Sequence, residues 1–111
     1  MKRYEVENYK TERGEAPFQK WIQNLPDARA QTALIARIDR ASFGNFGDWK
    51  AMAGAKGLFE MRIHYGQGYR IYYTIVGQTI ILLLAGSTKR SQDQAIAKAA
   101  GYLADYHRRV K

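Results

Sequence analysis

Residues 57–76 decide the fold, and they read GLFEMRIHYGQGYRIYYTIV. The odd-numbered side chains on both sides of the glycine-rich centre are apolar: Phe59, Met61, Ile63, Tyr69, Ile71, Tyr73 and Ile75. The even-numbered positions between them carry mostly polar side chains. An alternation with a period of two is typical of strands that bury one face. The stretch therefore predicts two antiparallel strands joined at Gly66-Gln67-Gly68.

The turns predict the strand register. A three-residue loop at 66–68 gives the pairs Tyr65 with Tyr69, His64 with Arg70, and Arg62 with Tyr72. Gly77-Gln78 predicts a tight turn with glycine first, which sets Tyr72 opposite Leu83 and Arg70 opposite Ala85. The returning strand, 79–85, is apolar on both faces and is expected to be central. One face of the sheet then presents Glu60, Arg62, His64, Arg70 and Tyr72.

The rest of the chain predicts an edge strand and three helices. Residues 4–9 read as a short edge strand, and Pro17 opens a helix that ends near Leu25 because Pro26 follows. Asp27 is suited to cap a second helix that runs to about Ser42. Ser91 and Gln94 predict a capping box for a last helix that lies on the sheet. The order β-α-α-β-β-β-α indicates one α+β domain over residues 1–111.

Composition narrows the classes of function. The chain has no cysteine, which excludes disulfides, thiolate catalysis and cysteine-based zinc sites and suits the reducing cytoplasm. The two histidines are far apart and the acids lack ligand spacing, so we expect no metal and no cofactor. No secretory leader or membrane span is visible, so a cytoplasmic protein is expected. The net charge of +8 favours a polyanionic partner, or serves solubility alone.

The basic residues of the polar face suit a phosphodiester. Arginine binds phosphate oxygens with paired donors, and tyrosine can stack on a base. Such a face could cleave RNA without a metal, through attack of the 2′-OH on phosphorus, proton transfer, and cations that offset the developing charge. The alternative reading is that Glu60 and Arg62 form a solvated, salt-bridged strand face.

Several segments resemble the "addiction module killer protein" (HigB-like) branch of the RelE/ParE toxin superfamily. The most specific are GLFEMRI (57–63) and GQGYRIYY (66–73), followed by IILLLAG (80–86). Further matches are Thr11-Glu12, Pro17-Phe18, Trp21, Gly47 to Lys50, Lys89 with Gln92-Asp93, and Ala104 to Tyr106. The resemblance spans almost the whole chain.

This resemblance implies a RelE-like fold and a type II toxin that cleaves mRNA in the ribosomal A site. The implied partners are a helix-turn-helix antitoxin, in a hetero-oligomer, and the ribosome with its mRNA. Arg70 matches the family's phosphate-binding arginine, and Arg62 and Lys89 fall at or near its other basic positions. We expect Tyr72 or His64 to assist proton transfer or stacking, and the positions implied for RNA binding are Lys50, Glu60, His64 and Arg90.

One departure from RelE is visible, because its stacking tyrosine has no counterpart between Gln92 and Ala99. Two other functions stay open at this point. A ParE-like inhibitor of DNA gyrase shares the fold, and fold alone does not decide function. A non-catalytic RNA-binding module would carry the same cationic face.

Overall fold

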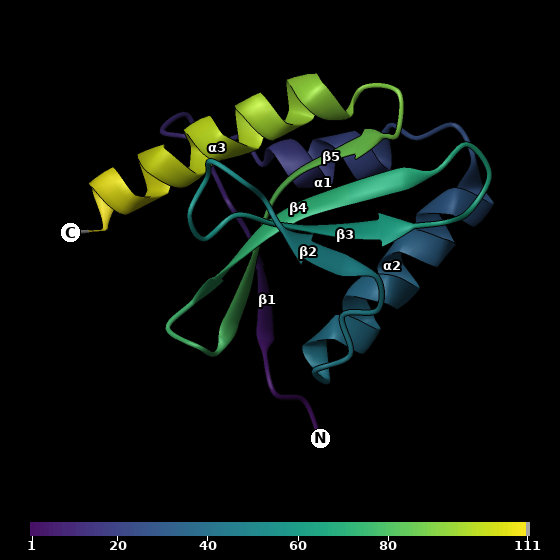
Figure 1. Ribbon diagram of the computed structural model, residues 1–111, viewed down its shortest axis with the longest axis horizontal. Coiled ribbons are helices and arrows are strands. Elements are labelled where there is room, and N and C mark those ends of the chain that lie inside the picture. Colours follow the sequence, from purple (N-terminus) through teal and green to yellow (C-terminus); the bar gives the residue numbers. More distant parts are fainter. Residues whose placement is uncertain (111) are drawn as a thin grey trace.

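The computed structural model describes residues 1–110, which form one five-stranded sheet and three helices (Figure 1). The strand order is β1-β5-β4-β3-β2, with β1 parallel to β5 and the other neighbours antiparallel. The elements are β1 (Glu5–Asn8), α1 (Pro17–Gln23), α2 (Ala28–Ser42), β2 (Trp49–Ala51), β3 (Phe59–Ile63), β4 (Tyr69–Val76), β5 (Ile80–Thr88) and α3 (Gln92–Arg109).

Helices cover both faces of the sheet, and each face has its own core (Figure 1). α1 and α2 pack on the face that carries Phe18, Leu34, Met61, Ile71, Tyr73 and Leu83. α3 packs on the opposite face, with Leu58, Tyr72, Leu82, Leu84, Ala99 and Leu103. This arrangement confirms the predicted α+β class and the placement of β5 between covered faces.

Two of the three helices begin with the N-terminal features that their local sequence predicts. Pro17 occupies the first turn of α1, and the Asp27 carboxylate accepts hydrogen bonds from Arg29 N at 2.9 Å and Ala30 N at 3.3 Å. The capping box predicted at Ser91 is wrong, because its side chain makes no cap bond within residues 1–110. Its hydroxyl instead lies 3.2 Å from Thr88 Oγ1.

The predicted register between β3 and β4 is wrong by two residues. Arg62 lies opposite Arg70, and Glu60 lies opposite Tyr72. The connection runs from residue 64 to 68, because Ile63 already pairs with Tyr69. A shift of two residues keeps every side chain on its face, so the predicted polar set stays together.

The register between β4 and β5 also differs from the prediction. Tyr72 lies opposite Ala85 and Arg70 opposite Ser87, because Val76 pairs with Ile80 and a bulge falls at Tyr72/Tyr73. The bulge leaves Leu84 without a partner on β4, and both Leu84 and Ala85 join the core under α3. In the turn, Gln78 as well as Gly77 has positive φ, 66° and 59°, so the turn is not of the glycine-first type.

Strand β2 was absent from the sequence prediction. It has three residues, all exposed, and it pairs with β3 at the outer edge of the sheet. Its short length and lack of apolar alternation hide it from pattern analysis. Its consequence for the site is that Lys50 lies opposite Glu60.

Gly86 allows the indole ring of Trp21 to lie directly against β5. A Cβ atom at this position would come within 2.1 Å of Trp21 Cε3. We therefore expect Gly86→Ala to lower the free energy of unfolding by about 1–3 kcal/mol through overpacking, measured by urea denaturation. In a Trp21→Leu background the same change should cost much less. An equal cost in both backgrounds would contradict this account.

No helix within the described range is both long and apolar enough to cross a membrane.

Candidate functional site

Arg62 and Arg70 lie side by side on neighbouring strands, as cross-strand partners of β3 and β4. Partners of this kind project from the same face of a sheet. Their neighbours Glu60 and Tyr72 form the next pair on that face, and Tyr72 places it on the side covered by α3. Four of the five predicted residues of the polar face therefore lie together.

A buried carboxylate joins the two arginines. Glu60 Oε1 lies 3.2 Å from Arg62 Nε, and Glu60 Oε2 lies 3.8 Å from Arg70 Nε. The Glu60 side chain is 4% exposed, that of Arg70 is 9% and that of Arg62 is 30%. Within residues 1–110 neither Nε atom has a hydrogen-bond partner of good geometry. The two guanidinium groups are thus held beside the carboxylate by charge, and their Nε atoms are themselves buried.

The structure corrects the sequence prediction in one respect, the solvent accessibility of the polar face. The polar face that we expected to bind a phosphodiester is partly closed to solvent, because Tyr72 is fully buried and Arg70 nearly so. The reason is the bulge and the packing of α3, which place Tyr72 in the core with Leu84 and Ala99. Tyr72 is therefore unavailable for stacking on a base in this arrangement.

Burial also sets the protonation state of Tyr72. Its hydroxyl lies 3.4 Å from Ser87 Oγ. Desolvation raises the pKa of Tyr72 to about 12, and the nearby Glu60 carboxylate acts in the same direction. The hydroxyl consequently stays neutral at physiological pH and serves as a hydrogen-bonding group.

The raised pKa of Tyr72 predicts a loss of stability in alkali. An unfolded tyrosine ionises near pH 10, so the stabilising contribution is complete below about pH 10 and is lost as pH rises through the folded pKa of about 12. Burial raises the pKa of Tyr73 as well, which adds to the trend. We expect the free energy of unfolding to fall over this window, and to fall less in Tyr72→Phe. Urea titrations at several pH values measure both slopes, and equal slopes would contradict the assignment.

Lys89 and Arg90 are exposed and extend the cationic surface beyond β5. Together with Gln67 they line a shallow pocket of about 460 Å³. Lys89 N donates to Gly68 O at 3.1 Å, which ties this segment to the β3–β4 loop. A Cβ atom at Gly68 would lie 3.5 Å from Lys89 Cβ and 4.0 Å from Arg70 Nη1. The Cβ atom of Lys89 therefore lies close to the guanidinium group of Arg70.

His64 and Lys50 lie at the rim of the same surface. His64 follows the last residue of β3, is exposed, and its Nε2 lies 2.7 Å from Asp48 Oδ2. This hydrogen bond lowers the pKa of the Asp48 carboxyl. Lys50 is exposed on β2, opposite Glu60. Three of the four residues predicted to bind RNA, Lys50, His64 and Arg90, are thus exposed around the arginine pair. The fourth, Glu60, is buried and paired with both arginines, so it is closed to RNA in this arrangement.

The sequence prediction did not identify three residues that lie near the site. Asp48 stands before a strand that was itself missed, so nothing marked it as a partner for His64. Ser87 would have been found opposite Arg70 only if both the shifted turn register and the bulge had been known. Arg37 on α2 donates to Arg62 O and Phe46 O, each at 2.8 Å, and so braces β3 from the other face.

This arrangement can bind and stabilise a phosphate group. Arg62 is the accessible member of the arginine pair, and Lys89 adds an exposed positive charge near Arg70. Arginine donors and fixed positive charges stabilise an anionic phosphorane far better in a partly desolvated site than in water.

Comparison with known proteins gives one family and one relative. Residues 20–106 match the family described as phage-derived protein Gp49-like. This range contains every site residue named above, from Arg37 to Arg90. A protein of Haemophilus influenzae, described as uncharacterized, is 43% identical over 82 residues, which are 74% of this chain and 81% of the relative.

Proposed function

Because the chain belongs to the family of Gp49-like phage-derived proteins, we propose that it is a type II toxin that cleaves messenger RNA on the ribosome. Proteins of this family are often toxins of toxin–antitoxin systems. Within that group the resemblance of residues 57–73 supports a HigB-like toxin with a helix-turn-helix antitoxin. The observation that carries the proposal is the pair Arg62 and Arg70 on one buried carboxylate, with Lys89 beside it.

In this proposal the cations act in two layers. Arg62 and Lys89 are accessible and contact the scissile phosphate first. Arg70 lies beneath them and stabilises the charge that develops on the phosphate oxygens as the 2′-OH gives up its proton and attacks phosphorus. The bond from phosphorus to the 5′ oxygen breaks in the same reaction, and that oxygen takes up a proton as it leaves. Glu60 holds both guanidinium groups in place before the substrate arrives, which lowers the cost of ordering them.

We assign proton transfer to side chains that the substrate can reach. His64 is the exposed titratable residue at the rim, and the Asp48 carboxylate orients its ring. Tyr72 acts as a positioning residue, since its neutral hydroxyl lies against Ser87 and close to Glu60. Lys50 and Arg90 bind the flanking RNA backbone.

The test is mRNA cleavage in a purified translation system, mapped by primer extension. Arg62→Ala and Lys89→Ala should each slow cleavage at least about tenfold, because each removes a charge that contacts the phosphate. Lys56→Ala, an exposed lysine in the loop before β3, is the matched control and should cleave as the wild type does.

Two results would overturn the proposal. The first is equal cleavage by the wild type and both site variants. The second is inhibition of DNA gyrase supercoiling by a protein that leaves mRNA intact, which would favour a gyrase inhibitor of the same fold.

A further inference from the structure

Strand β5 has one edge that is only half covered. β1 pairs with it from Ile80 to Leu83, and Tyr9 N donates the last bond of this edge to Leu83 O at 3.0 Å. β5 continues for five more residues, to Thr88. Leu84 lies at the bulge, and Ala85 to Thr88 pair with β4 alone within the described chain. Beyond the end of β1, the edge of β5 therefore has no neighbouring strand among the described residues.

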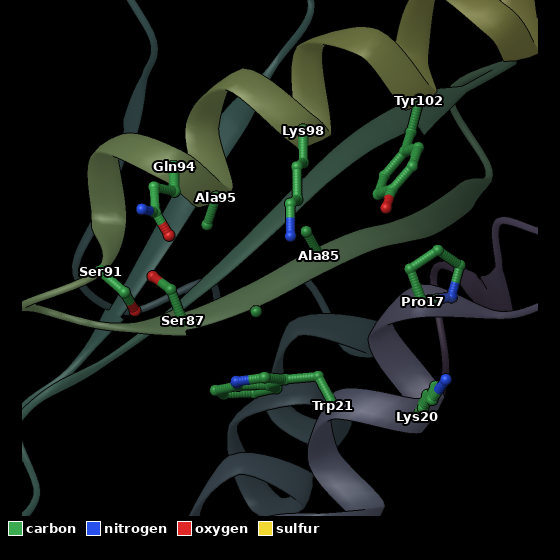
Figure 2. Close-up of a pocket in the computed structure, with 11 residues that line it drawn as sticks. Pro17, Lys20, Trp21, Ala85, Ser87, Ser91, Gln94, Ala95, Lys98 and Tyr102 are labelled. Carbon is green, nitrogen blue, oxygen red and sulfur yellow. The ribbon is translucent and has the colours of Figure 1, made fainter.

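A groove of about 450 Å³ runs along this edge, between α1 and α3 (Figure 2). Trp21 forms its wall on the side of α1, lying against Gly86. Lys98 and Tyr102 point from α3 toward β5 on the opposite side, as Figure 2 shows. The floor of the groove is the backbone of β5 from Ala85 to Ser87.

The backbone of this edge offers both donors and acceptors. Lys89 N bonds toward the β4 side, so alternation directs Gly86 and Thr88 into the groove. Thr88 O already accepts a hydrogen bond from Ser91 N at 3.3 Å. Among residues 1–110, this leaves the N–H and C=O of Gly86 and the N–H of Thr88 without a partner and open to a ligand. A phosphodiester has only acceptors and would leave the Gly86 carbonyl unpaired, whereas a peptide strand satisfies both kinds of group.

The side chains that line the groove also favour a ligand with negative charge. Lys20 on α1 and Lys98 on α3 are both exposed and line opposite sides of the groove. Successive side chains of a strand point to opposite sides. An added strand would therefore direct acidic side chains to Lys20 on one side and to Lys98 on the other, while apolar side chains contact Trp21 and Tyr102.

We propose that this groove binds an extended, acidic segment of a partner protein, which adds to the sheet as a strand beside residues 85–88 of β5. The identification of that partner as the antitoxin rests on the proposed function. The groove itself does not use Arg62, Arg70 or Lys89, so peptide binding and RNA cleavage are separable properties of the chain.

The probe is a set of short peptides in which pairs of glutamates alternate with pairs of valines, at up to millimolar concentration, so that each face of the added strand carries both an acidic and an apolar side chain. Amide hydrogen exchange followed by NMR should show slower exchange at Gly86 and Thr88 when the peptide is bound. The double variant Lys20→Glu with Lys98→Glu should lose at least about tenfold in affinity and should instead bind the matching peptides that carry lysine in place of glutamate. Peptides with N-methyl groups at every amide keep the charge but have no backbone donor on either edge, so they cannot pair and should not bind.

Three outcomes would overturn the inference. They are equal binding of the N-methylated peptide, no protection at Gly86 and Thr88 by any acidic peptide, and displacement of the peptide by single-stranded RNA that protects the same amides. A chain that binds the peptide but cleaves no mRNA would refute the toxin proposal and leave the groove assignment intact. A chain that cleaves mRNA but binds no peptide would do the reverse.

Discussion

Arg70→Ala is expected to slow mRNA cleavage by about 100- to 1,000-fold, the usual loss when one preorganised group that stabilises transition-state charge is removed. Arg70 is the most buried cation of the site, with 9% of its side chain exposed. A charge in such surroundings is screened less by water than that of Arg62, so its loss should have the larger effect. Single-turnover cleavage of a ribosome-bound message measures the rate.

The control for this variant separates chemistry from folding. Arg70→Lys keeps a positive charge without the planar guanidinium group and should retain an intermediate rate. Circular dichroism and the urea midpoint identify the fraction of each variant that is folded. A folded Arg70→Ala protein that cleaves at the wild-type rate would remove Arg70 from the mechanism.

Glu60→Leu is expected to lower the free energy of unfolding by about 3–5 kcal/mol, because it leaves the buried Arg70 without its ion-pair partner. The carboxylate is the shared partner of Arg62 and Arg70 and is 4% exposed. Urea denaturation measures the change.

Two further variants decide whether the loss comes from the unpaired charge. The double variant Glu60→Leu with Arg70→Leu should recover most of the stability, since removing both charges avoids the desolvation cost. Glu7→Ala, at an exposed position of β1, should change stability by no more than about 0.5 kcal/mol. A Glu60→Leu protein as stable as Glu7→Ala would show that the pair contributes nothing.

The sequence was sufficient to predict which residues share a face, and it was insufficient to predict their exact partners. Strand alternation placed Glu60, Arg62, Arg70 and Tyr72 together, and a register error of two residues left that result unchanged. The error arose because a glycine-rich loop can close over three or five residues with similar sequence. The bulge at Leu84 has no local signature, since Leu83, Leu84 and Ala85 are all apolar.

Accessibility was the property that alternation could not supply. The pattern marks the even-numbered residues of β4 as polar, and a polar face is ordinarily exposed. Here α3 lies on that same face, so Tyr72 and Arg70 are buried beneath it. Only the three-dimensional position of α3 relative to the strand ends decides which cations remain at the surface, and these are Arg62, Lys89 and Arg90.

The parallel pairing of β1 with β5 has a consequence for the order of events during synthesis. Glu5 cannot pair in the sheet until Ile80 has been synthesised, and Asn8 cannot pair until Leu83 has been synthesised. Contacts between residues so distant in the chain form late and slowly. The α1–α2 segment leaves the ribosome well before that point, while the arginine pair acquires its covering helix only after residue 92. A truncated nascent chain that ends before β5 lacks Lys89 and the helix that covers Arg70. Under the proposed function, a cell that makes this protein therefore meets its toxicity only when translation of the message is nearly complete.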